Sequence, residues 1–462
     1  MPTSQRGVRP LLLSVALLFV AGTVTAEWVR NNAQASAAVR AGACDTIGVA
    51  SMLVAYFEEM SVPKPFVVRQ GTAFARYRRE VRQKLLEKVS LSPLPGRIPL
   101  EVRRSVRLDH PWCTVRRVYY LLWPGVYASG LLYLPKELRE RPAPAMLCPH
   151  GHWPNGNAFP DEQKRCLVFA KRGYVVFSPS QYHYEDLSIG VSNQTLHVWN
   201  NMRALDYLQS LPEVDTTRIG CSGVSGGGLQ TQMLAALDER VKAATIVGMT
   251  CDFREILSPY RNHCRCNHFP GAMQFTDGPE ISALALPTPV QYLTMNDWTY
   301  NFRRDNFPTV EKLYAVNGRP QAVDCVFWPS GHNYDVPKRE RTYWWMGRWL
   351  CGEPPVETEK EPDEILTFPP ATLMALATDP PVDALPENRV AEQISAVYEK
   401  VKHYRPARIS GVAEWRSYRR QMVVKLRELL GEDAKLRRSA SGPQRVARQE
   451  EEGLVIERFR SK

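Results

Sequence analysis

The sequence predicts an α/β protein with a mostly parallel, doubly wound sheet that opens with an antiparallel hairpin. Short β-rich runs alternate with amphipathic helical runs over about 240 residues, an order typical of parallel sheets covered by helices. The first two β-rich runs, 115–123 and 127–134, are separated by Pro124-Gly125, and this dipeptide between two strands indicates a hairpin.

The other elements follow in order along the chain. A basic amphipathic helix is expected over 72–89, because apolar residues recur there at helical spacing. Sheets of this class bind ligands at the carboxyl ends of their strands, so we expect the functional residues there. Further strands are expected at 145–148, 174–178, 218–222, 241–247, 289–293 and 323–328, and helices at 167–172, 198–211, 229–237, 309–316 and 343–350.

One tight turn carries the strongest catalytic signal. Gly223-Val224-Ser225-Gly226-Gly227 lies between an apolar run and a helical run. This is the pattern of a nucleophile elbow, in which a strained turn holds the serine hydroxyl at the positive end of the next helix. Side chains at Gly223 or Gly227 would collide with the crossing backbone. A glycine-rich loop can match the motif by chance, so its context must support it.

A nucleophilic serine needs a base to take its proton, and the base needs an acid to orient it. In this arrangement the chain order is serine, acid and then histidine. His332 follows the last expected strand and is the expected base. Asp297 follows the preceding strand and is the expected acid, with Asp305 and Asp324 as open alternatives.

The developing negative charge on the substrate needs backbone N–H donors. One is expected from Gly226, directly after the nucleophile, and the other from His152. His152 belongs to the His150-Gly151-His152 loop, which follows the strand expected at 145–148. His150 is expected to brace this loop through side-chain hydrogen bonds.

Composition limits the partners of the chain. Of its 462 residues 44% are hydrophobic and 23% are charged, as in an ordinary globular protein. The net charge is +11, but residues 401–462 hold 16 Lys and Arg and 8 Asp and Glu, so +8 of it lies in that tail. The remainder is near neutral and has no basic patch with interleaved aromatic residues, so a nucleic-acid partner is not expected.

The segment 1–26 has the pattern of a secretory signal. Two arginines precede a short apolar run, and Val24-Thr25-Ala26 is a small-residue cleavage site. Cleavage after Ala26 would leave a secreted or periplasmic protein without stable membrane insertion, whereas an uncleaved anchor is the alternative. A helical lead-in is expected over 27–70.

Cysteine spacing gives little sign of a metal site. Cys148 and Cys221 fall on expected core strands and are interpreted as buried thiols. The run 263–268 contains His and Cys, but it lacks a second Cys/His pair at zinc-finger spacing. Neither a metal nor a cofactor is expected.

These motifs, taken together and in order, resemble the α/β-hydrolase superfamily. Within it the chain is similar to secreted bacterial acetyl xylan esterase-like and dienelactone-hydrolase-like proteins, over roughly residues 70–352. The resemblance implies a serine esterase that forms an acyl-enzyme on Ser225, with acetyl esters on polysaccharide as the implied substrate. The matching pieces are Pro149-His150-Gly151-His152, Arg218-Ile219-Gly220, Gly223-Val224-Ser225-Gly226-Gly227-Gly228, Cys266-Asn267-His268-Phe269-Pro270-Gly271, Asn296-Asp297-Trp298-Thr299 and His332-Asn333-Tyr334.

The resulting domain organisation places the hydrolase domain at 71–352, a Pro/Glu-rich linker at 353–386 and the truncated start of a second hydrolase-like repeat at 387–462. The repeat is inferred from a constant offset of 341 (418 − 77), although two similar basic helices could also arise by coincidence. The residues that correspond are Phe74, Tyr77-Arg78-Arg79, Val81, Lys84-Leu85 and Glu87 with Trp415, Tyr418-Arg419-Arg420, Met422, Lys425-Leu426 and Glu428.

Two other functions stay open. A serine peptidase of the prolyl-oligopeptidase kind shares the hydrolase domain, but only about 45 mature residues precede the basic helix, too few for a β-propeller. A non-catalytic binding protein on a hydrolase fold is the second.

The expected partner is a small-molecule or oligosaccharide ester. Its identity depends on loops at 153–166, 179–197 and 252–285, whose shapes the sequence does not give. Aromatic residues that would suit stacking on sugar rings, although such residues also fill cores, are Trp153, Tyr182, Tyr184, Trp298 and Tyr300.

Overall fold

The computed structural model describes residues 66–181, 192–257, 264, 267, 269, 271–354, 360–378, 409–430, 444–451 and 454–460. The chain divides into two compact units, Met1–Val401 and Lys402–Lys462. The expected signal segment at 1–26 lies outside the described residues, as does nearly all of the lead-in at 27–70.

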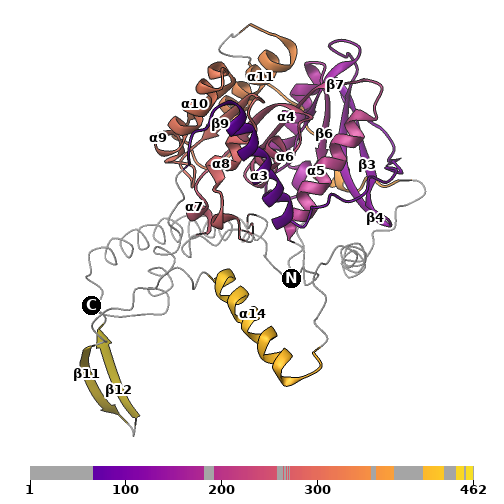
Figure 1. Cartoon of the computed structure of the whole chain (residues 1–462). Coiled ribbons are helices and arrows are strands. Elements are labelled where there is room, and N and C mark those ends of the chain that lie inside the picture. Colours follow the sequence, from indigo (N-terminus) through magenta and orange to yellow (C-terminus); the bar gives the residue numbers. More distant parts are fainter. Residues whose placement is uncertain are drawn as a thin grey trace, which may run out of the picture. The chain divides into compact units, whose positions relative to one another are not determined.

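The first unit is built on a ten-stranded sheet (Figure 1). Its strands lie in the order β1-β3-β4-β6-β5-β7-β8-β9-β10, with β2 also paired to β3. The pairings of β3 with β4 and of β4 with β6 are antiparallel, and all pairings from β6 to β10 are parallel. The predicted fold class is therefore confirmed. The strands are β1 Arg103–Arg104, β2 Leu108–Asp109, β3 Cys113–Trp123, β4 Val126–Pro135, β5 Ala143–Leu147, β6 Val175–Pro179, β7 Val214–Val224, β8 Val241–Val247, β9 Val290–Thr294 and β10 Val323–Phe327.

Helices cover both faces of the sheet, as a doubly wound sheet requires. Residues of α3, α5, α6, α8 and α10 belong to one buried apolar cluster, and residues of α4, α11 and α12 belong to another. The helices are α3 Gly71–Lys88, α4 Pro160–Lys171, α5 Asn193–Gln209, α6 Gly226–Leu237, α7 Phe253–Leu257, α8 Gly278–Ala283, α9 Phe302–Asp305, α10 Phe307–Val316, α11 Val336–Cys351 and α12 Pro370–Met374. Short 3-10 turns lie at Gly156–Ala158, Ala272–Gln274 and Pro320–Ala322.

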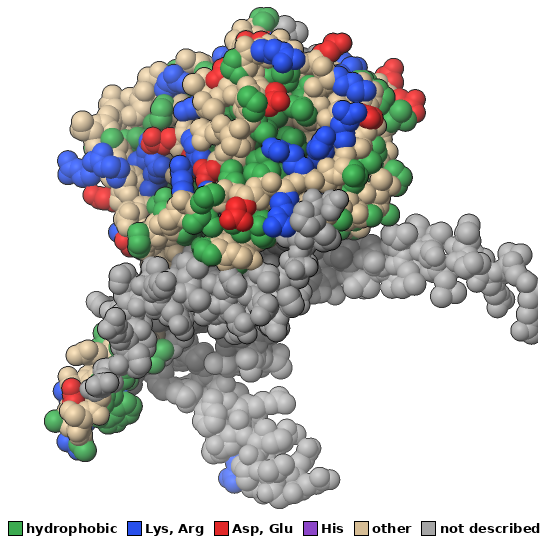
Figure 2. Space-filling view, turned by 90° about the vertical axis from the view of Figure 1, so that its right-hand side faces the viewer, with side chains coloured by type: hydrophobic (Ala, Val, Ile, Leu, Met, Phe, Trp, Pro, Cys, Tyr) green, Lys and Arg blue, Asp and Glu red, His purple; other side chains and the backbone are tan. Residues whose placement is uncertain are grey.

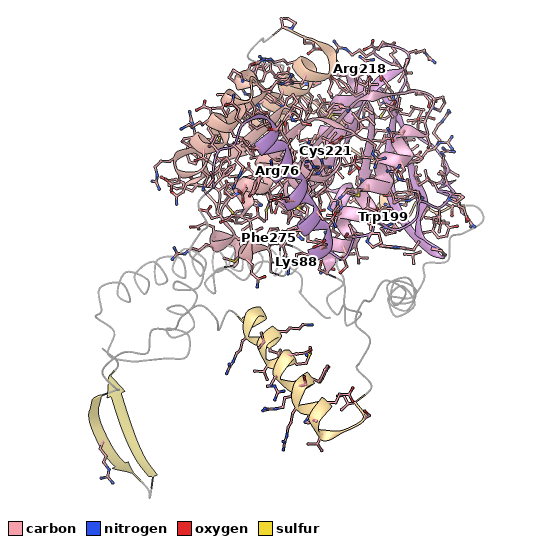
Figure 3. The ribbon with its side chains drawn as sticks, viewed as in Figure 1. Arg76, Lys88, Trp199, Arg218, Cys221 and Phe275 are labelled. Atoms are coloured by element: carbon pink, nitrogen blue, oxygen red, sulfur yellow. The ribbon has the colours of Figure 1, made fainter. Side chains whose placement is uncertain are left out.

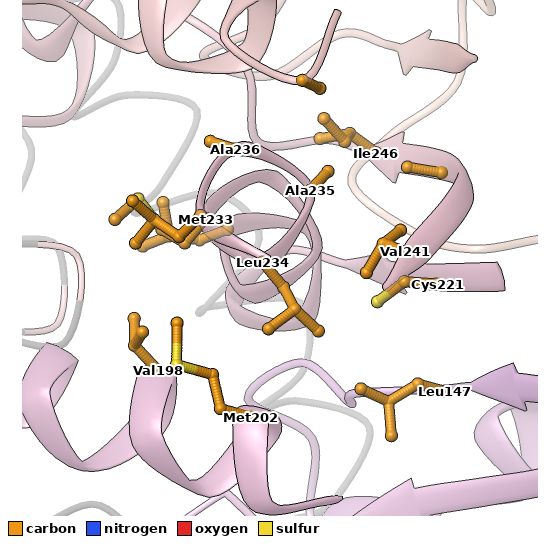
Figure 4. Packing of buried hydrophobic residues seen from close by; sticks show 14 of the residues in the cluster. Leu147, Val198, Met202, Cys221, Met233, Leu234, Ala235, Ala236, Val241 and Ile246 are labelled. Carbon is orange, nitrogen blue, oxygen red and sulfur yellow. The ribbon is translucent and has the colours of Figure 1, made fainter. Parts of the chain in front are cut away.

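Helix α6, which follows the expected nucleophile, is packed on nearly all sides (Figure 4). Every residue from Gly227 to Leu237 is buried, and this includes the polar residues Gln230, Thr231 and Gln232. Cys221 of β7 is fully buried in the same cluster (Figures 3 and 4). Cys148 is fully buried as well and neither thiol forms a disulfide, so both were interpreted correctly.

Most of the predicted elements are present, some with different bounds. The predicted strand 241–247 has the bounds of β8, whereas α5 and α11 each begin several residues earlier than predicted. Strands β1 and β2 have two residues each and were not predicted, because so short a strand shows no alternation of apolar and polar residues.

Part of the predicted linker is a packed element of the first unit, which corrects that prediction. In residues 360–378, Glu361 forms a buried ion pair with Arg339 at 2.7 Å, and Leu373 is fully buried. His110 and Gln163 donate hydrogen bonds to the carbonyl groups of Leu366 and Phe368. Composition alone did not reveal this packing, because a Pro- and Glu-rich segment can be bound to a domain through hydrogen bonds to its own backbone carbonyl groups and through buried ion pairs of its glutamates.

Charged side chains of both signs are interspersed on the face of the first unit shown in Figure 2. No helix in the described part of the chain is long and apolar enough to cross a membrane. Neither observation tests the expected absence of a nucleic-acid partner, which stays a prediction.

The second unit contains one helix and one hairpin among its described residues. Helix α14 spans Val412–Leu430, and strands β11 (Gln444–Glu451) and β12 (Leu454–Arg460) pair antiparallel. A one-residue irregularity interrupts their register between Arg445 and Ala447.

Asp277 connects two short helices of the 252–285 region. Its carboxylate accepts hydrogen bonds from the backbone N–H groups of Phe253 at 2.6 Å and Gly278 at 2.7 Å. Burial is the main cause that raises the pKa of this carboxyl from 3.8 to about 6, and the nearby carboxylates of Asp252 and Glu280 add to it. The folded chain therefore holds a proton on Asp277 that the unfolded chain releases at lower pH.

This proton should make stability depend on pH. The contribution of the raised pKa is complete below 3.8 and is lost as the pH rises through about 6. Between about pH 4.5 and pH 7, the urea midpoint of the wild type should therefore fall relative to that of Asp277→Asn, which does not titrate. Asp109→Asn, at a side chain that is 60% exposed, should keep the wild-type dependence. Parallel curves for wild type and Asp277→Asn would contradict the assignment.

Candidate active site

Ser225 occupies a strained turn between β7 and α6. Its φ of 57° and ψ of −123° lie in a region that non-glycine residues rarely adopt, and such strain concentrates at functional sites. The turn is held by two hydrogen bonds, from Ser225 N to Val247 O at 3.0 Å and from Leu229 N to Ser225 O at 2.9 Å. The geometry is that of the predicted nucleophile elbow.

The two flanking glycines are required for steric reasons. A Cβ at Gly223 would lie 2.5 Å from the carbonyl oxygens of Gly227 and Pro149, and a Cβ at Gly227 would lie 2.3 Å from Pro149 O. Real Cβ atoms do not approach backbone atoms this closely. The close crossing that the sequence predicted for both glycines is therefore confirmed.

His332 and Asp297 form a short hydrogen bond. The distance between His332 Nδ1 and Asp297 Oδ2 is 2.7 Å, and the side chain of Asp297 is only 3% exposed. The other oxygen, Oδ1, accepts from Thr299 N at 2.7 Å and from Thr299 Oγ1 at 2.5 Å. With both oxygens engaged, the carboxylate is fixed in place and so fixes the imidazole.

The two alternative acids have other partners. Asp324 accepts hydrogen bonds from Gln291 and Arg341, and Asp305 is paired with Arg304. The structure therefore places Asp297, and neither Asp305 nor Asp324, beside the imidazole of His332.

The free side of the imidazole and Ser225 both adjoin the end of β8. Ser225 N donates to Val247 O, and a Cβ at the next residue, Gly248, would lie 3.2 Å from His332 Cε1 and from Asp297 Oδ2. His332 Nε2 is buried and has no hydrogen-bond partner among the described residues. This nitrogen is thus available as a proton acceptor beside the elbow.

The loop after β5 lies against the elbow. A Cβ at Gly151 would lie 3.2 Å from Ser225 Cβ, and a Cβ at Gly226 would lie 2.7 Å from the ring atom Cε1 of His152. The two residues expected to supply oxyanion donors, Gly226 and His152, are therefore neighbours.

His150 braces this loop, as predicted. Its ring is buried, Nδ1 is 2.7 Å from Gly151 O, and Nε2 is 2.9 Å from Gln181 N. A carbonyl only accepts and a backbone N–H only donates, so both bonds require the neutral tautomer with the proton on Nδ1. His150 is thus structural, because both of its nitrogens are used within the protein.

A buried ion pair that the sequence did not indicate supports the same loop. Glu162 Oε1 accepts from Trp153 Nε1 at 3.0 Å and from Gly151 N at 3.4 Å. Arg165, fully buried, pairs with Glu162 and donates to Ser222 O at 2.9 Å and Pro149 O at 3.3 Å. Burial raises the pKa of Glu162, and the guanidinium of Arg165 partly offsets this effect. The only sequence signal is the i, i+3 spacing on α4, which is common on solvated helices.

Aromatic rings flank the imidazole. The ring centroid of Trp298 lies 4.3 Å from that of His332, and the centroid of Trp153 lies 6.1 Å from it. Tyr300 is 56% exposed and packs edge-on against Phe327. The other two aromatic residues considered for substrate stacking, Tyr182 and Tyr184, lie outside the described residues.

No cluster of three or more His, Cys, Asp or Glu in the described part of the chain is arranged to hold a metal ion. Most of the 263–268 run falls outside that part, so the expectation of no metal stays a prediction.

Comparison with known proteins agrees with this geometry. The family model for acetyl xylan esterase (AXE1) matches residues 194–263, the range that contains the elbow. The Bacillus subtilis (strain 168) protein YtaP, whose name places it only in the broad class of hydrolases, is 24% identical over 294 residues, 56% of this chain and 96% of YtaP. Human acyl-coenzyme A thioesterase 1 is 30% identical over 165 residues, 33% of this chain and 37% of the thioesterase.

A solved structure shares the fold. The methylesterase BT1017 superposes with a TM-score of 0.58 at 22% identity, over 77% of this chain and 80% of that protein. At this identity the likeness concerns the fold alone. The chain thus has the fold of an α/β hydrolase, and over residues 194–263 it is similar to the acetyl xylan esterase family.

Proposed function

We propose that the chain is a secreted serine esterase in which Ser225 is the nucleophile, His332 the general base and Asp297 the orienting acid. The observation that carries the proposal is the convergence at the end of β8. The strained Ser225 is bonded to Val247, and the Asp297–His332 pair lies against Gly248 with Nε2 free of other bonds among the described residues. Secretion is supported by the signal-like pattern of the segment 1–26.

The reaction proceeds by two acyl transfers. His332 Nε2 takes the hydroxyl proton while Ser225 Oγ attacks the ester carbonyl, and Asp297 stabilises the resulting imidazolium. The amides of Gly226 and His152 donate to the oxyanion. His332 then gives its proton to the departing alkoxide, which leaves as the alcohol. Water, deprotonated by the same imidazole, attacks the acyl-enzyme and releases the acid and free Ser225.

Acetyl esters on polysaccharide are the substrate we favour. The family model that matches the elbow region is that of acetyl xylan esterase, and the tryptophans beside His332 provide flat apolar surfaces on which sugar rings can stack. A thioester is the second candidate, because the relative at 30% identity is named as an acyl-coenzyme A thioesterase. The peptidase and binding-protein readings have no such support.

Removal of the nucleophile tests the mechanism. Ser225→Ala should lower kcat for p-nitrophenyl acetate by about 10³-fold or more and abolish labelling by a fluorophosphonate probe. Asp297→Asn should lower kcat by roughly 10⁴-fold, because the imidazole then takes the wrong tautomer. Ser210→Ala, at the end of α5, serves as the control and should behave as wild type. Continued turnover or labelling of a folded Ser225→Ala protein would remove Ser225 from this role.

A substrate panel separates the candidates. Acetylated xylo-oligosaccharides, a methyl ester of a uronate, an acetyl thioester and a peptide anilide are compared by kcat/KM. We expect the acetylated oligosaccharides to lead, and Trp298→Ala to raise KM for them more than for p-nitrophenyl acetate, because the small ester has no sugar ring to stack. A higher kcat/KM for the thioester would favour the second candidate.

A further inference from the structure

A buried lysine lies next to the loop that carries His332. Lys338 is in the first turn of α11, and its side chain has an exposed fraction of 0%. Its ammonium group donates to Ser330 Oγ at 2.7 Å, to Asn333 Oδ1 at 2.6 Å and to Asp335 Oδ1 at 2.9 Å. Lysine has three N–H donors, so each is used by a different residue of one short loop.

The same loop is tied to the residues around Asp297. Ser330 O accepts a hydrogen bond from Asn296 N at 2.9 Å, and Asn333 N donates to Met295 Sδ at 3.4 Å. The residues on both sides of His332 are therefore joined to the loop that bears Asp297. Both of these residues, Ser330 and Asn333, also accept hydrogen bonds from Lys338.

We propose that Lys338 is a positioning residue for catalysis, which acts through Ser330 and Asn333 to keep the imidazole of His332 aligned with Asp297 and Ser225. The inference rests on the proposed function. A buried cation is costly unless fully paired, and here the pairing is concentrated on the catalytic loop. An apolar side chain of the same length would remove the donor that joins Ser330, Asn333 and Asp335 and so release the loop.

Lys338→Met tests this inference in the full chain. We expect kcat for p-nitrophenyl acetate to fall about 10- to 100-fold with KM changed less than about twofold, because misplacement of a base affects the chemical step more than binding. Lys338→Arg should recover part of the loss. Lys360→Met is the matched control, since the Lys360 side chain is 73% exposed, and it should leave kcat unchanged.

A second readout does not depend on turnover. The downfield proton resonance of the His332 Nδ1–H, bonded to Asp297, should shift or broaden in Lys338→Met and persist in Lys360→Met. This resonance keeps the inference testable even if the wild type cleaves no ester, an outcome that would overturn the proposed function and not the positioning role.

Asn333→Ala covers the case in which Lys338→Met does not fold. It removes one of the three acceptors and should lower kcat by a smaller factor, and Asn333→Asp, which keeps an acceptor oxygen, should restore activity. The positioning role is overturned if folded Lys338→Met, or Asn333→Ala in its place, retains wild-type kcat and an unchanged resonance. The positioning role is also overturned if the fraction of unfolded protein in each variant fully accounts for its loss of kcat.

An independent observation concerns the second unit. The hairpin pairs Gln444 with Arg460 and Arg445 with Phe459, and beyond the irregularity it pairs Gln449 with Ile456 and Glu450 with Val455. In the first unit β1 and β2 pair with β3 as Arg103 with Tyr119, Arg104 with Val118, Leu108 with Val115 and Asp109 with Thr114. Each of these four pairs of the second unit is a pair of the first unit displaced by the same offset on both strands, as the first pair shows (444 − 103 = 460 − 119 = 341).

The other features share this offset. Helix α14 begins at Val412 and α3 at Gly71, which gives the same difference (412 − 71 = 341). The irregularity after Arg445 lies where the first unit changes from β1 to β2. Register is otherwise free to vary by single residues, and a slip of one would exchange the faces of a strand. Two unrelated segments are not expected to share the start of the helix, the strand register and the position of the irregularity at one constant offset.

We infer that residues 412–460 are a second copy of the segment from α3 to β3 of the hydrolase domain. Within the first unit the helix of this segment is packed, since Phe74 of α3 is 6% exposed.

Disulfide trapping of matched cysteine pairs tests the copy. Glu450→Cys with Val455→Cys should cross-link under mild oxidation, as should the equivalent pair Asp109→Cys with Thr114→Cys, because directly opposed residues have close Cβ atoms. Glu451→Cys with Val455→Cys, displaced by one residue, is the control. Cross-linking of the displaced pair in preference to 450/455, while 109/114 cross-links normally, would overturn the inference.

Discussion

The strained conformation of Ser225 is the constraint on which the rest of the site depends. A side chain at positive φ is unfavourable, and here it is maintained by the bond to Val247 at the end of β8 and by the two glycines that let Pro149 cross the turn. Because the elbow is bonded to β8 and touched by the loop after β5, its position is set by three adjacent strands. The hydroxyl is thus presented by the sheet and not by a mobile loop.

Two loops beside the elbow are each held by hydrogen bonds from a buried cationic side chain. Arg165 in α4 donates to the carbonyl groups of Ser222, just before the elbow, and of Pro149 in the loop after β5, and Lys338 in α11 donates to the loop of His332. Both cations are fully buried, and each lies on the helix that follows the loop it holds. Tyr334 connects the two systems, because its hydroxyl bonds to Ser222 and its ring lies under Arg165. Fixed donors of this kind keep catalytic groups in place without reorganisation during the reaction.

The functional conclusions have different foundations. The similarity to ester hydrolases rests on the fold, on the family model over residues 194–263 and on the relatives, whereas the ester cleaved depends on surface loops, some of which lie outside the described residues. The strand register of the second unit matches that of the α3–β3 segment at a constant offset, which agrees with the repeat that the sequence pattern suggested.

The sequence by itself determined the order of strands and helices, the elbow at Ser225 and the proximity of Asp297 to His332. Apolar periodicity is local, and loops that follow neighbouring parallel strands must meet at one edge of the sheet. Only the tertiary structure decided that Glu162, Arg165 and Lys338 are buried, and that residues 360–378 pack on the hydrolase domain. The local sequence around a charged residue does not show whether its side chain faces water or a buried acceptor, because its burial depends on chain segments far away in the sequence.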